Sequence, residues 1–180
     1  MVHYENMHKD EIIKASKEIF NRFTDTCLQI PDEKFFLQPL EKWSIAQNAD
    51  HLIRAMKTTQ LAYSLPKFFV RIVGGKPNRP SRSYEELVAK YRLKLEQGGK
   101  ATGRYIPKVS VTKKFLLMQQ WQKKNENYLE SLELKWSDGQ LDQYIAPHPL
   151  LGKITLRELC YFTIYHTEHH LNIVVNRMKD

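Results

Sequence analysis

The chain is 180 residues long, with 42% hydrophobic residues, 27% charged residues and a formal net charge of +8. This length suits one core of ordinary size, so we expect a single domain over residues 1–180. No apolar run approaches the roughly twenty residues that cross a bilayer, and the polar start MVHYENMHKDEII does not resemble a secretory signal.

The positive charge is spread along the chain rather than gathered in one dense run. Modest groups occur at Lys76/Arg79/Arg82, Lys113/Lys114 and Lys123/Lys124. A nucleic-acid-binding protein usually carries a denser basic run or a recognisable motif. We therefore favour a solvated basic surface, and a small-molecule partner, over nucleic-acid recognition.

Residues 8–30 form the first predicted helix, because their apolar residues recur at three- and four-residue spacing. Pro31 ends this helix, since proline cannot continue the backbone hydrogen-bond ladder. Residues 31–42 are expected to form a loop, in which Phe35 and Phe36 cover one end of the core rather than bind a ligand.

The second long helix is predicted to begin at Ser44, whose hydroxyl can cap the helix while Gln47 reaches back to it. Pro66 marks its end or a kink. The break that follows is rich in Gly, Pro and Ser, and its FFVRIV stretch fits a short strand or another helical turn equally well. The structure of residues 66–83 therefore stays open.

A capping box of Ser83 and Glu86 begins a short helix over residues 84–97. A long helix is expected over 112–134, and a third capping box precedes the last helix, over 156–178. No segment alternates as a strand would. The elements predict an all-α protein: a four-helix bundle with an extra short helix and a long loop between main helices 2 and 3.

Three of the seven histidines lie in the last predicted helix, within the stretch YHTEHH. At about 100° per residue, His170 and His166 fall near the apolar face of this helix, whereas His169 and Glu168 fall toward its outer side. Side chains at i and i+4 lie on adjacent turns, so His166 and His170 can converge on one metal ion. The alternative is a set of partly exposed or hydrogen-bonded histidines that bind no ligand.

His51 lies midway along the second helix, at the edge of its apolar stripe. A histidine there is most often structural, but the facing helices of a bundle bring their inward residues together. Three neutral imidazoles would leave coordination positions open for water or substrate, as in catalytic metal sites. The metalloprotease pattern is absent, because Thr167 stands where a glutamate would follow the first histidine.

Two separated stretches of the sequence resemble the DinB/YfiT-like family of four-helix-bundle proteins. One is EKWSIAQNADHLIRA at 41–55, in which a Trp-Ser helix start leads to His51. The other is HPLLGKITLRELCYFTIYHTEHHLNIV at 148–174, in which an H-P-x-x-G-x-x-T pattern precedes a terminal H-x-x-x-H. The resemblance follows nearly the whole chain in order and spacing.

This resemblance implies a divalent metal, such as nickel or zinc, held by His51, His166 and His170. It also implies an activity among those of the family, which include S-transferases that use low-molecular-weight thiols, isomerases of thiol adducts and hydrolases. Several family members are dimers, so a homodimer is expected. Residues 62–110 match nothing specific and would be where substrate preference varies.

Several polar neighbours have both a structural and a functional interpretation. Asn48, one turn before the first candidate ligand, is either a hydrogen-bond partner of the site or a polar residue on the helix face. Glu168 and His169 would relay protons if the helix were rotated, although a solvated pair is favoured. Arg54 and Arg157 could contact an anion, although surface charges are the favoured interpretation.

The cysteines and tryptophans are assigned to the core. Cys27 and Cys160 lie in helices without C-x-x-C spacing, which indicates reduced thiols and a cytoplasmic protein, while a disulfide between them stays open. Cys160 lies too far around the helix from the histidine pair to be a fourth ligand. The tryptophans expected in the core rather than around a substrate are Trp43, Trp121 and Trp136.

Two classes of function follow from the sequence. The first is a metal-dependent enzyme on a small-molecule substrate, acting by hydrolysis through an activated water or by S-transfer through a thiolate. The second is a non-catalytic, stress-related helical binding module, whose +8 charge would give weak affinity for nucleic acid.

Overall fold

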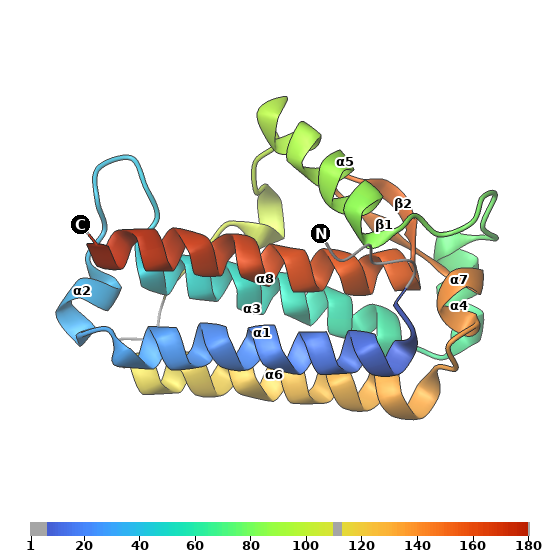
Figure 1. Cartoon of the computed structure of the whole chain (residues 1–180), viewed down its shortest axis with the longest axis horizontal. Coiled ribbons are helices and arrows are strands. Elements are labelled where there is room, and N and C mark those ends of the chain that lie inside the picture. Colours follow the sequence, from blue (N-terminus) through green and yellow to red (C-terminus); the bar gives the residue numbers. More distant parts are fainter. Residues whose placement is uncertain (1–6, 110–112, 180) are drawn as a thin grey trace.

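The computed structural model of the chain describes residues 7–109 and 113–179. Four long helices lie side by side in it and form a bundle (Figure 1). They are α1 (Lys9–Gln29), α3 (Ile45–Ser64), α6 (Lys114–Lys135) and α8 (Leu156–Lys179). The all-α four-helix bundle predicted from the sequence is confirmed.

Each long helix packs against two others, so the four form a closed ring in the order α1, α6, α3, α8. α1 and α3, which follow one another in the chain, therefore lie on a diagonal of the bundle. Their connection, residues 30–44, contains the short helix α2 (Asp32–Phe36) at one end of the bundle, where a loop was expected (Figure 1). The diagonal arrangement makes α3 and α8 neighbours.

The helix starts follow the capping boxes that the sequence predicts. The Ser44 hydroxyl accepts a hydrogen bond from the Gln47 backbone N–H at 3.0 Å, and the Gln47 side chain accepts one from the Ser44 N–H at 2.7 Å. The other two boxes, before α5 (Tyr84–Glu96) and before α8, make the same reciprocal bonds. Each box satisfies two of the backbone donors that a helix start leaves unpaired.

Aromatic side chains fill the space between the long helices. The rings of Phe23 and Trp121, both fully buried, meet edge to face with centroids 5.5 Å apart. Tyr63 and Tyr128 meet in the same way at 5.1 Å. Such pairs stabilise the core beyond the area they bury. Phe35 on α2 is also fully buried, so it covers the end of the core as predicted.

The described part of the long connection between α3 and α6 contains two helices and a 3₁₀ turn. These are α4 (Lys67–Gly74), α5 and η1 (Gly103–Tyr105). The FFVRIV stretch lies in α4, so the open choice between strand and helix is decided in favour of helix. α5 packs on α8, outside the ring of four (Figure 1). The start predicted for the next long helix, residue 112, lies outside the described residues.

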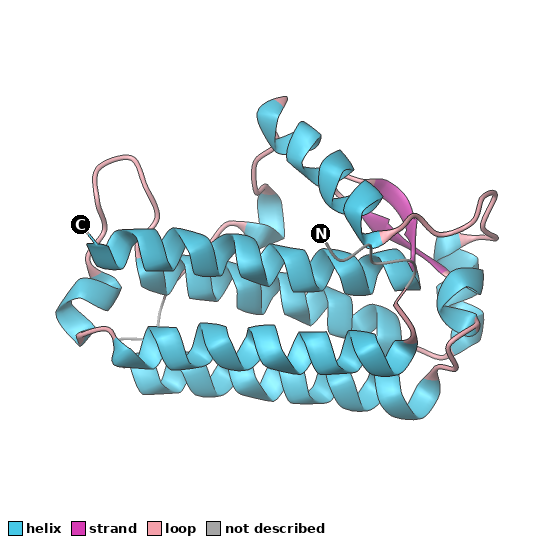
Figure 2. Ribbon diagram, viewed as in Figure 1, coloured by secondary structure: helices cyan, strands magenta, loops and turns pink. Residues whose placement is uncertain are grey.

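A two-stranded antiparallel hairpin precedes α8, so the expectation of a chain without strands is wrong there (Figure 2). β1 (Ile145–His148) pairs with β2 (Gly152–Thr155), and His148 stands opposite Gly152. The strands are four residues long and β1 contains Pro147, so neither shows the alternation that identifies longer strands. Gly152 has a φ of +75°, a conformation that favours glycine in the turn.

The short helix α7 (Gln140–Gln143) joins α6 to the hairpin. Among the helices of the described residues, none combines the length and the apolar character that a membrane span requires.

Gly74, at the end of α4, allows this helix to pack directly on β1. A Cβ added at Gly74 would lie 1.9 Å from the Ile145 carbonyl oxygen, so the backbone would have to move. We expect Gly74→Ala to lower the free energy of unfolding by about 1–3 kcal/mol in urea denaturation. Gly139→Ala is the matched control, because no heavy atom lies within 4 Å of its added Cβ. Equal effects of the two substitutions would contradict the direct packing of α4 on β1.

Candidate metal centre

Three histidine side chains from two neighbouring helices converge beside the core. His51 comes from α3, and His166 and His170 come from adjacent turns of α8. The Nε2 atom of His166 lies 3.1 Å from Nε2 of His51 and 3.2 Å from Nε2 of His170. The three residues are buried, with exposed fractions of 6%, 5% and 4% in chain order. The structure thus brings the three sequence-predicted ligands together.

Hydrogen bonds at the other ring nitrogens determine where the protons lie. His51 Nδ1 lies 2.7 Å from the Tyr105 carbonyl oxygen, which can only accept, so this Nδ1 carries the proton. His170 Nδ1 lies 2.7 Å from the Asn48 side-chain oxygen. The Asn48 amide nitrogen donates to the Ser44 carbonyl at 2.8 Å, which fixes the amide orientation and makes its oxygen an acceptor. Both Nε2 atoms therefore present lone pairs.

Each histidine offers one ring nitrogen, and the three nitrogens lie within 4.8 Å of one another. The two separations that involve His166 suit one divalent ion. With metal–nitrogen bonds of about 2.1 Å, two ligand nitrogens lie about 3.0 Å apart at a right angle and about 3.4 Å apart at the tetrahedral angle. The separations of 3.1 and 3.2 Å lie between these limits. Without a cation, lone pairs of His51 and His170 would face a third imidazole that has a single Nε2 proton to share. The donor set therefore fits a three-histidine metal centre with open positions.

Burial keeps these imidazoles in the neutral form that binds metals. It holds the pKa of His166 and that of His170 well below the usual value, and the neighbouring histidines lower them further. Burial also lowers the pKa of His51, although the hydrogen bond to Tyr105 partly offsets this effect. No proton has to leave these three rings before an ion binds at neutral pH.

A carboxylate next to His51 holds the loop that supplies the Tyr105 carbonyl. Asp50 accepts a hydrogen bond from the Lys108 backbone N–H at 2.6 Å and another from Arg54 Nε at 2.7 Å. The Lys108 bond ties the chain just after η1 to α3, so the Tyr105 carbonyl stays in reach of His51. Arg54 is thus engaged with Asp50 in an ion pair, which places it in the support of the site rather than at an anion.

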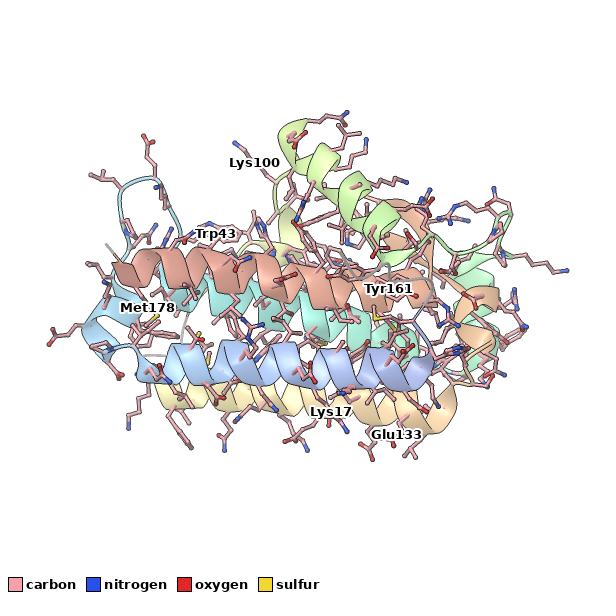
Figure 3. The ribbon with its side chains drawn as sticks, viewed as in Figure 1. Lys17, Trp43, Lys100, Glu133, Tyr161 and Met178 are labelled. Carbon is pink, nitrogen blue, oxygen red and sulfur yellow. The ribbon has the colours of Figure 1, made fainter. Side chains whose placement is uncertain are left out.

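The three imidazoles lie in the wall of a pocket of about 880 Å³. Its other walls come from α5, the hairpin turn and the loop around η1. Apolar side chains, including Tyr91, Leu150 and Phe162, line much of the pocket. Trp43 and Lys100, which also line it, lie on the side of α8 that faces α5 (Figure 3). A small molecule with an apolar body has the room to reach the Nε2 atoms.

The rim of the pocket carries more positive than negative charge. The basic residues that line it are Lys42, Lys100, Arg104 and Arg177, whereas Glu41 is the one carboxylate among the described lining residues. Lys42, Lys100 and Arg104 are exposed to solvent. This balance attracts anionic molecules toward the opening.

The remaining sequence-predicted neighbours take different positions. Asn48 is 2% exposed and contacts His170 directly, as described above. His169 is half-buried and lines the pocket, with its ring centroid 5.2 Å from that of His170. Glu168 is half-buried and lies outside the set of lining residues in the described part of the chain. The structure therefore brings His169, but not Glu168, to the pocket.

Two expectations for charged and aromatic residues are wrong. Arg157 is 4% exposed and makes two hydrogen bonds to the Asp142 carboxylate, at 2.8 and 2.9 Å, so it is neither a surface charge nor an anion contact. Trp43 is half-buried in the pocket wall, with its ring centroid 5.1 Å from that of His51. Trp121 and Trp136 are core residues as expected.

The cysteines behave as buried thiols. Cys27 and Cys160 are both buried and not bonded to each other, which excludes the disulfide that the sequence left open. Cys160 lies 2.9 Å from the Tyr63 hydroxyl, and burial raises the pKa of its thiol to about 11. A thiol of this kind is a poor nucleophile at neutral pH, so Cys160 acts as a core residue.

Two contributors to the pocket were not assigned a role from the sequence. The Tyr105 carbonyl is a backbone atom in a loop, and no side-chain pattern could have identified it. His148 belongs to the H-P-x-x-G stretch, which was recognised only as part of a motif, and it lines the pocket. The signal available for His148 was its position in a turn rich in proline and glycine directly before the histidine-bearing helix.

Comparisons with known proteins agree with the observed architecture. The family model of the DinB superfamily matches residues 17–174. One similar solved structure is the colibactin self-resistance protein ClbS in complex with double-stranded DNA, at 15% identity and a TM-score of 0.64, over 99% of this chain and 98% of that chain. No curated protein matches the sequence.

A second similar structure is YfiT from Bacillus subtilis, described as a probable metal-dependent hydrolase with an unusual four-helix bundle topology. The identity is again 15%, with a TM-score of 0.62 over 95% of this chain and 86% of that chain. At such identities the likeness shows the fold alone.

The buried neutral histidines predict a loss of stability in mild acid for the metal-free protein. Their folded-state pKa values lie below the value of about 6.5 for an unfolded histidine, so their contribution is present above pH 6.5 and is lost as the pH falls below it. We expect the free energy of unfolding to fall between pH 7.5 and 5.5, by up to about 1.4 kcal/mol per pH unit for each such histidine. Urea denaturation after treatment with EDTA measures it.

Two variants identify the source of this pH dependence. His166→Gln removes one buried imidazole and should reduce the fall in stability. His8→Gln changes a side chain that is 82% exposed and leaves the three buried imidazoles in place, so most of the fall should remain. A wild-type stability that is constant over this pH range would show that the buried histidines do not control it.

Proposed function

Because the chain belongs to the DinB superfamily, we propose that it is a divalent-metal-dependent enzyme acting on a small molecule bound beside His51, His166 and His170. The observation that carries the proposal is the convergence of three Nε2 atoms, two of which carry no proton because their Nδ1–H groups are engaged elsewhere. Imidazole ligands suit nickel, zinc and similar ions.

The chemistry of the site would combine a metal with groups that the chain itself supplies. A divalent ion held by the three imidazoles would make a water or a thiol acidic enough to provide a nucleophile at neutral pH. Asn48 and the Tyr105 carbonyl hold the rings of His170 and His51 in position. Phe162, stacked on His166 with centroids 4.8 Å apart, keeps one side of the site apolar. The basic rim would guide an anionic substrate to the opening.

Two reactions are consistent with this arrangement. In a hydrolysis, a water oxygen bonds to an electrophilic carbon, and the leaving group departs with the proton. In an S-transfer, the sulfur of a low-molecular-weight thiol bonds to the electrophilic carbon, the bond from that carbon to its leaving group breaks, and the thiol proton departs with the leaving group. The description of YfiT favours hydrolysis by analogy, whereas the basic rim suits a thiol that carries carboxylates.

A homodimer and a cytoplasmic location remain predictions. Sedimentation velocity at several protein concentrations would establish whether the chain dimerises.

The metal proposal predicts a bound divalent ion in protein prepared without a histidine tag. We expect about one ion per chain by elemental analysis, and its loss in the triple variant His51→Ala, His166→Ala, His170→Ala. His8→Ala, which removes an exposed imidazole, should leave the metal content unchanged. Circular dichroism establishes that the triple variant is folded. Equal metal contents in the wild type and a folded triple variant would exclude the site.

Asn48 provides a graded test of the same site. Asn48→Ala removes the acceptor for His170 Nδ1–H and should weaken metal affinity by about 10- to 100-fold. Asn172→Ala, an exposed change on α8, is the matched control. The metal-loaded wild type can then be assayed for ester hydrolysis and for conjugation of several thiols to a chromogenic electrophile. Activity in one assay that depends on His166 would select that reaction.

Nucleic acid is retained as a second candidate ligand. The sequence alone favoured a solvated basic surface, but ClbS, one of the similar structures, is bound to double-stranded DNA. The basic rim and the net charge of +8 supply the positive charge that phosphate contacts require.

This second candidate predicts binding to duplex DNA that weakens steeply with salt. Fluorescence anisotropy between 50 and 200 mM salt should show the affinity falling by about tenfold or more. The double variant Lys100→Ala, Arg104→Ala should weaken binding, whereas Lys123→Ala, Lys124→Ala on α6 serves as a charge-matched control. No binding at the lowest salt concentration would remove this candidate.

A further inference from the structure

The hairpin turn before α8 contains a histidine with one ring nitrogen fully engaged. His148 Nδ1 accepts hydrogen bonds from the backbone N–H groups of Leu150, at 3.2 Å, and Leu151, at 3.1 Å. A backbone N–H can only donate, so Nδ1 carries no proton. A neutral imidazole has one N–H, which must therefore be on Nε2. Burial lowers the pKa of His148 to about 4, so the ring is neutral at pH 7.

The turn geometry makes this tautomer permanent. Residues 149–151 form the loop of the hairpin, and Gly152, with a φ of +75°, brings the chain back to pair with His148. Both N–H groups that point at Nδ1 belong to this loop. Moving the proton to Nδ1 would break two hydrogen bonds within the turn, so His148 presents a hydrogen-bond donor on its other side and cannot exchange it for an acceptor.

The residue that carries this donor lines the pocket, next to the candidate metal centre. The ring of His148 contacts Phe162 with centroids 4.2 Å apart, and Phe162 stacks on His166 at 4.8 Å. One phenylalanine ring therefore separates His148 from a candidate ligand. Within the described residues, Nε2 of His148 makes no hydrogen bond to another side chain or to the backbone, while Pro147, Pro149 and Leu150 line the pocket around it.

A fixed N–H donor among apolar groups is selective for one kind of partner. It pairs with an oxygen that accepts, such as a carbonyl or carboxylate oxygen, and it opposes an ammonium group or another N–H donor. A molecule that fills the apolar wall without such an oxygen would leave the donor unpaired and would bind more weakly.

We infer that His148 positions the substrate, with its Nε2–H donating a hydrogen bond to a carbonyl or carboxylate oxygen on an otherwise apolar ligand. The inference rests on the proposed function in taking this pocket as the substrate site. It assigns a substrate class: an apolar molecule with a carbonyl or carboxylate oxygen. That oxygen would lie at His148, on the other side of the Phe162 ring from His166. It requires no metal, so metal-free protein can test it.

The test uses the full chain, treated with EDTA, and two neutral probes of similar size. 4-Phenyl-2-butanone carries a carbonyl oxygen, whereas butylbenzene carries none. Isotope-detected NMR of the His148 ring should show the proton on Nε2 in the free protein and a shift of that nitrogen on saturation with the ketone. Butylbenzene gains more free energy on leaving water, so the quantity compared is the ratio of ketone affinity to butylbenzene affinity, here called the ketone preference. We expect the ketone preference to be about three- to tenfold higher in the wild type than in His148→Asn, the effect of one neutral hydrogen bond.

Two substitutions separate ligand binding from the structure of the turn. In His148→Asn, the side-chain oxygen can accept from Leu150 and Leu151 as an Asx turn, but no donor reaches the Nε2 position. This variant should keep the wild-type melting temperature and lose the preference for the ketone. In His148→Gln, the amide N–H reaches the Nε2 position and the turn acceptor is displaced, so the preference should be partly kept while the melting temperature falls.

A proton on Nδ1, no saturable binding of the ketone, or an unchanged ketone preference in a folded His148→Asn variant would each overturn the inference. If His148→Asn unfolds, the tautomer and the shift of the His148 ring nitrogen on saturation with the ketone still decide it. Because the probes are titrated without metal, this result and the metal analysis of the three histidines can fail independently.

Discussion

The structure depends on holding the Nε2 atoms of His51 and His170 within 3.2 Å of the Nε2 atom of His166, at the boundary of two helices. Two of these atoms present lone pairs, so their approach is unfavourable unless a cation lies between them. Hydrogen bonds from His170 to the Asn48 side-chain oxygen and from His51 to the Tyr105 carbonyl hold the rings in place against this repulsion. Those bonds require the close packing of α3 on α8 and the loop that Asp50 ties down. The packing of α3 on α8 therefore determines the geometry of the three histidines.

Around this centre, the long helices hold the histidines, and the shorter segments form the rest of the pocket. α3 and α8 hold the ring nitrogens rigidly, because both are long and start at defined caps. The hairpin turn, the chain around η1 and α5 complete the pocket and bring side chains of a different character: a fixed donor at His148, apolar walls, and positive charge at the rim. The candidate metal ligands and the residues that would determine substrate specificity thus lie on different elements. The specificity-determining residues can therefore change without disturbing the histidines.

The sequence predicted those parts of the molecule that follow from periodicity and local chemistry. The long helices, the capping boxes and the inward positions of His166 and His170 are properties of single helices, and each can be read from spacing. The hairpin, the exposure of Trp43 and the burial of Arg157 depend on which segments meet in space. Arg157 looked like a surface charge because its partner Asp142 stands 15 positions earlier, in a segment for which no helix or strand was predicted. The role of the Tyr105 carbonyl could not be predicted, because every residue has a backbone carbonyl.

The diagonal placement of α1 and α3 has a consequence for the order in which the chain folds and would bind a metal ion. It puts α8 beside α3, so His51 meets His166 across 115 positions of sequence. A chain that lacks α8 holds a single one of the three imidazoles, and no local segment can gather the set. Loop closure over such a distance is costly in entropy and occurs late in folding. An ion bound by the three histidines would stabilise only those chains in which α8 has docked on α3.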